Sequence, residues 1–207
     1  MSKNVKPSFT RRSLRLQTRE FVLIATEGAV TEKEYIDAVV ACFQQKAKER
    51  FGKNVVVSRK YVSSNHRSVP TARLRALKRE ASLNRIDDNY TAGLICDLDQ
   101  WNSEQFHEIK TWEEKNKARN HWILNSPNFE FWLSLHFKNT AEFQKYVKRN
   151  GKRVGTNDFT YEEIVKACSR ARSSYPRDSS LFEQDGSRMF LFIEYLAKFF
   201  GLEADFQ

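Results

Sequence analysis

The chain has 207 residues, of which 40% are hydrophobic and 29% charged, a composition that fits a globular protein with one sizeable core. A net charge of +9 at pH 7 points to nucleic acid as a partner, and no run approaches the roughly 18 consecutive apolar residues of a membrane helix or resembles a signal peptide. The three cysteines lie far apart, which argues against a disulfide framework or a zinc cluster, so we expect a cytoplasmic protein without a membrane partner.

Positive charge is concentrated in two segments. Residues 1–20 carry six lysines and arginines against a single acid, and residues 145–177 carry nine against three acids. Residues 1–19 contain few apolar side chains and are predicted to form a flexible basic tail. Either segment can be a solvated surface or a contact with phosphate groups, and the composition leaves both open.

The first structural unit is a strand followed by a helix. Residues 21–26 form a continuous apolar run, typical of a strand buried on both faces of a parallel sheet. Thr31 and Glu34 have the spacing of a capping box, which predicts that a helix begins there. The capping box accounts for Glu34 but not for Glu27, which ends the strand beside Gly28, a residue that permits a tight turn or a close approach of ligand.

The same alternation of strand and helix continues to residue 124. Further strands are predicted at residues 54–62, 94–98 and 121–124, and further helices at residues 70–84 and 103–119. This order predicts an α/β fold with a parallel four-stranded sheet flanked by helices. Right-handed crossovers place the carboxyl ends of all four strands at one edge, where open sheets of this class bind their ligands.

Asp97 and Asp99 follow the third predicted strand. Successive side chains of a strand alternate between faces, so these two carboxylates point the same way and suit a hard divalent cation. A turn or a helix cap is the alternative, although Asn102 and Ser103 are better placed to cap the next helix. Because Glu27 shares this edge of the sheet, the three acids need a cation, a proton or a basic partner, and a metal ion is the simplest solution.

The segment at residues 128–137 is apolar nearly all round. It predicts a buried helix with Pro127 in its first turn. Glu130 stands out in this segment, and it is either a further ligand or base-orienting group at the edge of the sheet, or a carboxylate favoured by the helix dipole or a buried pair. His136 is predicted to be a buried histidine with a satisfied hydrogen bond rather than a ligand.

After residue 138 the alternation stops. Helices are predicted at residues 141–147, 160–172 and 187–200. The predicted organisation is therefore a basic tail at residues 1–19, a core at 20–138 and a helical C-terminal subdomain at 139–207.

Three motifs in this order resemble the RloB family. They are Glu27-Gly28 with Thr31-Glu32-x-x-Tyr35, Asp97-x-Asp99, and Asn125-Ser126-Pro127-x-Phe129-Glu130-x-Trp132-Leu133-x-Leu135-His136-Phe137. The third motif is the most specific, and the resemblance covers roughly residues 20–140. RloB proteins are bacterial, are encoded near restriction and abortive-infection loci, and are usually paired with an ABC/SMC-type ATPase called RloA. The family is regarded as a variant of the Toprim domain of topoisomerases, primases and OLD-type nucleases.

The resemblance implies a Toprim-like core that cleaves phosphodiesters. Glu27 matches the Toprim glutamate, a general acid/base or metal ligand, and Asp97 and Asp99 match the aspartate pair that holds Mg²⁺ or Mn²⁺. Glu130 is expected to be a fourth member of the catalytic group from its predicted position near the edge of the sheet, not from the resemblance. The basic residues expected to contact the nucleic acid are Lys60, Arg67, Arg73, Lys148, Arg149, Lys152 and Arg153.

Three functions remain open at this stage. The first is a metal-dependent endonuclease acting on RNA, with tRNA among the possibilities, or on DNA, as the effector of an antiviral defence pair with an RloA-like ATPase. The second is a nucleic-acid-binding or regulatory module that controls the ATPase without cutting. The third is a phosphatase-like enzyme, because Asp97-Leu98-Asp99 also resembles a phosphoryl-transfer pair, although such a pair is expected on an early strand and before a Thr or Val where this chain has Trp101.

Overall fold

The structure of the protein, a computed structural model, describes residues 19–28, 30–63, 69–83, 90–98, 101–175 and 184–206. Its strands are β1 (Arg19–Thr26), β2 (Val56–Ser63), β3 (Thr91–Asp97), β4 (Asn120–Ser126) and β5 (Gly186–Ser187). Its α-helices are α1 (Thr31–Phe51), α2 (Pro70–Leu83), α3 (His107–Lys115), α4 (Phe129–Ser134), α5 (Thr140–Asn150), α6 (Tyr161–Ser174) and α7 (Met189–Phe200). Short 3₁₀ helices are η1 (Ser103–Phe106) and η3 (Glu203–Phe206).

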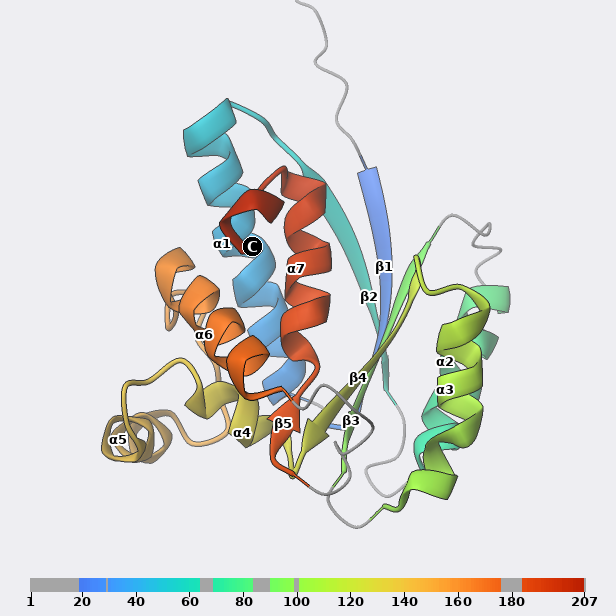
Figure 1. The fold of residues 1–207 in the computed structure, drawn as a ribbon. Coiled ribbons are helices and arrows are strands. Elements are labelled where there is room, and N and C mark those ends of the chain that lie inside the picture. Colours follow the sequence, from blue (N-terminus) through green and yellow to red (C-terminus); the bar gives the residue numbers. More distant parts are fainter. Residues whose placement is uncertain are drawn as a thin grey trace, which may run out of the picture.

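The strands form one five-stranded sheet in the order β2-β1-β3-β4-β5. Strands β1 to β4 are parallel, and β5 is antiparallel to β4. Asp97 at the end of β3 pairs with Asn125 of β4, which in turn pairs with Ser187 of β5. The carboxyl ends of the parallel strands therefore meet at one edge, at the bottom of Figure 1 beside α4 and β5.

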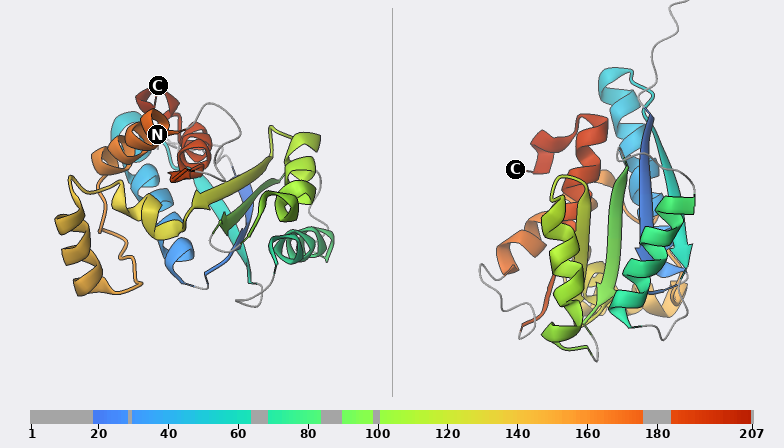
Figure 2. Two further views of the ribbon diagram at one scale, coloured as in Figure 1. Left: turned by 60° about the horizontal axis from the view of Figure 1, so that its bottom comes forward. Right: turned by 90° about the vertical axis from the view of Figure 1, so that its right-hand side faces the viewer.

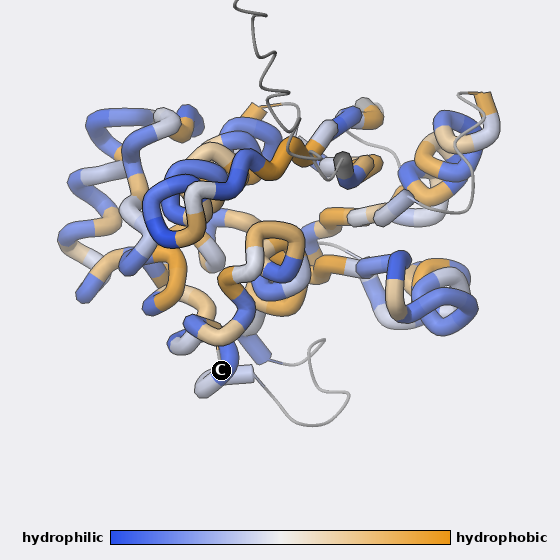
Figure 3. The backbone as a smooth tube through the Cα atoms, turned by 90° about the horizontal axis from the view of Figure 1, so that it is seen from above, coloured by the Kyte–Doolittle hydropathy of each residue, from blue (hydrophilic) through white to orange (hydrophobic). Residues whose placement is uncertain are grey.

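Helices cover both faces of the sheet. Figures 1 and 2 show α2 and α3 on one face and α1, α6 and α7 on the other. Alternate residues of β1 serve the two faces, because Val22 and Ile24 belong to the cluster under α1, α6 and α7, whereas Leu23 and Ala25 belong to the cluster under α2 and α3. Hydrophobic segments gather in the middle of Figure 3, whereas the outlying coils mix both kinds of residue. Within the described ranges, every helix is too short or too polar to span a bilayer.

The predicted α/β class is confirmed, but the sheet is mixed rather than wholly parallel. The sequence predicted only helices after residue 138, whereas Gly186 and Ser187 form β5 against the end of β4. A strand of two residues is too short to show an alternating pattern. The backbone holds it in place, and the next residue, Arg188, donates its N–H to the carbonyl oxygen of Leu124 at 2.9 Å.

The segment at residues 128–137 also differs from its prediction. Helix α4 covers only part of it, and Pro127 precedes the helix rather than lying in its first turn. The side chain of Asn128 caps α4 by accepting a hydrogen bond from the backbone N–H of Phe131 at 3.3 Å. Phe131 is partly exposed, so the helix is not buried on all sides.

A glycine ends α1, and the predicted burial of His136 is confirmed. Gly52 ends α1 with φ at 62°, the left-handed region that favours glycine. His136 is buried, with its Nε2 atom 3.1 Å from the hydroxyl of Tyr35. Burial lowers the pKa of His136 to about 3, so the ring is neutral at physiological pH and belongs to the core.

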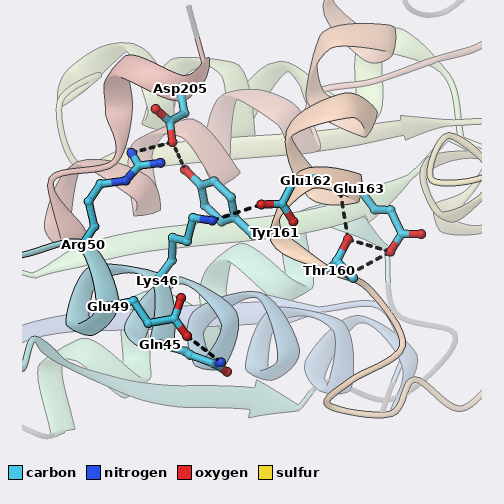
Figure 4. A network of polar contacts seen from close by, with 9 residues as sticks. All are labelled: Gln45, Lys46, Glu49, Arg50, Thr160, Tyr161, Glu162, Glu163 and Asp205. Atoms are coloured by element: carbon cyan, nitrogen blue, oxygen red, sulfur yellow. Dashed lines mark hydrogen bonds and ion pairs between the residues drawn. The ribbon is translucent and has the colours of Figure 1, made fainter.

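A network of polar contacts joins α1 to the C-terminal helices (Figure 4). The Arg50 Nη1 atom lies 2.7 Å from the Asp205 carboxylate, which also accepts a hydrogen bond from Tyr161 at 2.7 Å. Lys46 pairs with Glu162 at 3.0 Å. Residues of α6 and α7 share one hydrophobic cluster with α1 and the sheet. The division into a core and a C-terminal subdomain stays a prediction, but the two segments pack together closely.

Candidate functional site

A pocket of about 570 Å³ opens where β1 and β3 end. Its walls come from the end of β1, the first turn of α1, the end of β3, the start of α4 and the loop between α5 and α6. The lining residues are Glu27, Gly28, Val30, Thr31, Glu32, Asp97, Asn128, Phe129, Glu130, Lys152 and Arg153. The pocket therefore combines carboxylates, which can hold a cation, with cationic side chains, which attract phosphate.

Glu27 is held at both of its carboxylate oxygens. Its Oε1 atom lies 2.7 Å from Nη2 of Arg73, and its Oε2 atom accepts a hydrogen bond from the backbone N–H of Asp97 at 3.1 Å. The first of these contacts comes from α2 and the second from the end of β3. The predicted meeting of Glu27 and Asp97 at one edge of the sheet is thus observed, and Glu27 has little freedom to move.

Arg73 occupies a different place from the one predicted. The sequence placed it on the surface as a phosphate contact, whereas its side chain is 0% exposed and faces Glu27 from α2. None of its three guanidinium nitrogens makes a well-aligned hydrogen bond with a described residue, so the 2.7 Å contact is an ion pair of imperfect geometry. A buried charge needs a counter-charge, and the Glu27 carboxylate supplies it for this guanidinium.

Asp97 is oriented by a chain of hydrogen bonds from the C-terminal segment. Its Oδ1 atom accepts a hydrogen bond from Nδ2 of Asn125 at 3.2 Å. The Asn125 oxygen accepts a hydrogen bond from the Ser187 hydroxyl at 2.6 Å, and the Ser187 oxygen accepts the backbone N–H of Met189 at 3.1 Å. The short strand β5 and the start of α7 therefore set the position of Asp97.

The pKa of Asp97 is raised to about 8, chiefly by burial and also by the neighbouring carboxylates Glu32 and Glu27, against the opposing effect of the Asn125 amide. Excess negative charge thus surrounds this side chain. A bound cation would relieve the repulsion and let Asp97 ionise.

Glu32 is a member of the pocket that the sequence analysis did not single out. It is only 3% exposed, and its Oε1 atom accepts the backbone N–H of Gly28 at 2.7 Å. Burial is the largest cause of a raised pKa for Glu32, and the charges of Glu27 and Glu130 add to it. In the sequence, a carboxylate in the first turn of a helix is ordinary, and only its position shortly after the Glu27-Gly28 pair could have drawn attention to it.

The predicted capping box at Thr31 and Glu34 is wrong, because both side chains bind a distant loop instead. The Thr31 hydroxyl donates to the carbonyl oxygen of Lys152 at 2.8 Å, and Glu34 accepts the backbone N–H of Val154 at 2.9 Å. Glu34 also lies 3.2 Å from Nε of Arg153. These contacts fix the basic loop between α5 and α6 at the rim of the pocket.

The donor chemistry of the pocket suits a hard divalent cation, since oxygen is the ligand atom that Mg²⁺ and Mn²⁺ prefer. In the described part of the chain, however, no three side chains of His, Cys, Asp or Glu are gathered closely enough to hold a metal ion. Asp99, one of the predicted ligands, lies outside the described residues. A metal ion at Asp97, and the full set of its ligands, therefore stay a prediction.

A protein-family comparison gives one result. The family model described as RloB-like protein matches residues 22–196. The chain belongs to the RloB-like family. No curated protein and no solved structure matches it. The family match extends into α7, so the C-terminal helices are part of what makes this chain RloB-like, whereas the motifs in the sequence carried the resemblance only to about residue 140.

Some of the other residues predicted to serve the site of this RloB-like chain line the pocket, and others lie outside it. Glu130 lines it, as does the predicted basic pair Lys152 and Arg153. Lys148 and Arg149 are exposed on the last turn of α5, just before that pair. Lys60 lies on β2 and pairs with Glu80 at 2.5 Å. Arg67 lies outside the described residues.

Replacing Gly28 with alanine should destabilise the protein by about 1–3 kcal/mol, the usual cost of overpacking a tight site. A Cβ atom at this position would lie 2.1 Å from the Oε2 atom of Glu32. The free energy of unfolding, measured with urea, would report the loss. The double variant Gly28→Ala with Glu32→Ala removes the clash and should recover stability relative to Gly28→Ala alone. Equal stability of Gly28→Ala and the wild-type protein would show that Glu32 is not packed against this turn.

Proposed function

We propose that this RloB-like protein is a divalent-metal-dependent nuclease with a Toprim-like site, acting on RNA or DNA. The observation that supports the proposal is the pocket at the carboxyl ends of β1 and β3, where Glu27, Glu32, Asp97 and Glu130 face a rim that carries Lys152 and Arg153. Open α/β sheets bind their ligands at this edge. Carboxylates beside cationic side chains are the combination that phosphodiester hydrolysis requires.

Each group has a role in this proposal. Asp97, with Asp99 and Glu27 as the partners expected from the family resemblance, would hold Mg²⁺ or Mn²⁺. The ion would offset charge on the phosphate and lower the pKa of an attacking water molecule. Lys152 and Arg153 would bind the phosphodiester backbone, and Arg73 would keep Glu27 in place. An RloA-like ABC/SMC-type ATPase as partner, and a role in antiviral defence, rest on the family resemblance alone.

A cleavage assay tests the proposal. Purified protein would be incubated with total tRNA and with plasmid DNA, with Mg²⁺, Mn²⁺ or EDTA. We expect divalent-dependent cleavage that falls by about 100-fold or more in Asp97→Asn, the scale of losing a group that stabilises transition-state charge. The matched control is Glu114→Gln, which changes an exposed carboxylate on α3 outside the pocket and should leave cleavage unchanged. Cleavage that persists in EDTA or in Asp97→Asn would contradict the proposal.

One observation favours the alternative of a module that binds nucleic acid without cutting it. Both carboxylate oxygens of Glu27 are already engaged, by Arg73 and by the backbone of Asp97. A carboxylate held in this way has no oxygen left to orient a water molecule unless one of these contacts breaks. Nucleic-acid binding without cleavage, with and without the ATPase partner, and unchanged by Glu27→Gln, would support this second function.

A further inference from the structure

A second groove of about 490 Å³ lies next to the carboxylate pocket. The two share Asn128 and Glu130, so they are continuous across the start of α4. The groove is largely aromatic, with Phe131, Phe137 and Phe143 among its lining residues. The rings of Phe137 and Phe143 lie 5.6 Å apart, centre to centre, at an angle of 47°. An aromatic surface thus begins where the carboxylate pocket ends.

Phe131 is the unusual member of this surface. Its neighbours Trp132 and Leu133 are buried, whereas Phe131 is partly exposed and belongs to neither hydrophobic cluster of the fold. Its backbone is held in place, because the N–H of Phe131 is bonded to the capping side chain of Asn128. A partly exposed aromatic ring that the core does not use is available to a ligand.

Both cavities contain carboxylates, but only the carboxylate pocket also has cationic side chains. Lys152 and Arg153 lie on its rim, whereas the charged residues lining the groove are the acids Glu130 and Asp185. A phosphate group is therefore attracted to the basic rim of the pocket and repelled by the groove. An uncharged planar group fits the groove better. The Ser134 hydroxyl donates to the Phe131 carbonyl and the Asn139 amide oxygen caps α5, so for such a group Ser134 offers an acceptor oxygen and Asn139 its amide donor.

We propose that the groove binds an unpaired nucleobase of a single-stranded nucleic acid, with the base stacked on Phe131. This inference rests on the proposed function, since it places the phosphodiester next to that base in the carboxylate pocket. Every base has a flat face that stacks on an aromatic ring, so the groove recognises single-strandedness rather than sequence. A base-paired duplex offers no such face until a base is taken out of the stack.

Binding experiments in EDTA, where metal-dependent cleavage is absent, test the groove separately from catalysis. Fluorescein-labelled oligonucleotides of one sequence, as RNA and as DNA, would carry a single abasic nucleotide at each position in turn. Fluorescence anisotropy gives the affinity. We expect one position at which loss of the base weakens binding by about tenfold or more, the usual effect of removing a stacked base. The RNA and DNA series show which backbone the pocket accepts, and the corresponding duplex should bind more weakly than the single strand.

Phe131→Ala should weaken binding of the intact oligonucleotide by a similar factor and abolish the dependence on abasic position, whereas Phe131→Tyr should retain both. The control is Phe51→Ala, which removes an aromatic side chain that is 42% exposed at the far end of α1. Thermal unfolding would confirm that each variant is folded. The proposal for the groove would be overturned if the affinity were the same at every abasic position, or if its dependence on position were unchanged by Phe131→Ala. This holds even if the protein cleaves nucleic acid. If the affinity depended on the abasic position but no cleavage occurred, the proposal for the groove would stand and the nuclease proposal would fail.

Discussion

Asp97→Asn should make the metal-free protein more stable than the wild type while abolishing divalent-dependent cleavage. The pKa of Asp97 rises from 3.8 to about 8 on folding, because burial and the carboxylates Glu32 and Glu27 disfavour its charged form. Between these two pKa values the folded state keeps a proton that the unfolded state releases. The wild-type protein therefore loses stability as the pH rises from about 4 to 8, and the asparagine variant is spared this loss.

The expected gain is about 1–2 kcal/mol at pH 5 and about 3–5 kcal/mol at pH 7.5. Urea unfolding in EDTA at both pH values measures it. Asp37→Asn is a control of opposite sign, because Asp37 accepts bonds from Arg59 and Tyr61, each at 2.8 Å, and its loss should reduce stability. If Asp97→Asn were less stable than the wild type at pH 7.5, the carboxylate would not be under the electrostatic strain inferred here.

Arg73→Met should destabilise the protein by about 3 kcal/mol. The substitution leaves Glu27 beside a buried apolar side chain, and breaking a buried ion pair by removing one partner is costly. The cost falls at the lower end of the usual range because the Glu27 side chain is 20% exposed and water partly solvates it. Urea unfolding in buffers without guanidinium gives the free energy of unfolding.

A double-mutant cycle with Glu27→Gln separates the ion pair from packing. The double variant should be more stable than the sum of the two single losses predicts, since neither charge is then left alone. Arg75→Met is the matched control on the same helix, because Arg75 is 72% exposed and lies 3.9 Å from Glu108, and it should change stability little. Strict additivity of the two losses would show that the 2.7 Å contact contributes nothing to the fold.

The sequence predicted the main strands and the edge at which Glu27 and Asp97 meet, because both depend on local patterns. A continuous apolar run reveals a buried strand, and parallel strands connected by helices must end on the same side. Two features could not be predicted from such patterns. Two-residue β5 has no periodicity, and the exposed face of α4 at Phe131 reads in sequence like the rest of an apolar helix.

Contacts between side chains far apart in the sequence also could not be predicted. Thr31 and Glu34 have capping spacing, but they bind a loop about 120 residues away, and local spacing cannot reveal that competitor. Arg73 sits among other basic residues on an amphipathic helix, so it resembles a solvated charge until the position of Glu27 is known. Asp99 and Arg67 lie outside the described residues, and their roles stay predictions.

The position of β5 has a consequence for any attempt to isolate the N-terminal part of the chain. Without β5, β4 would become the edge strand of the sheet, with unpaired backbone groups at Asn125 and Ser126. Open edges recruit strands from other molecules, so a fragment ending near residue 138 should self-associate. The same cut would remove Ser187, the partner of the Asn125 amide oxygen. A fragment of this chain that keeps the pocket intact therefore has to retain β5, because β5 covers this edge of the sheet.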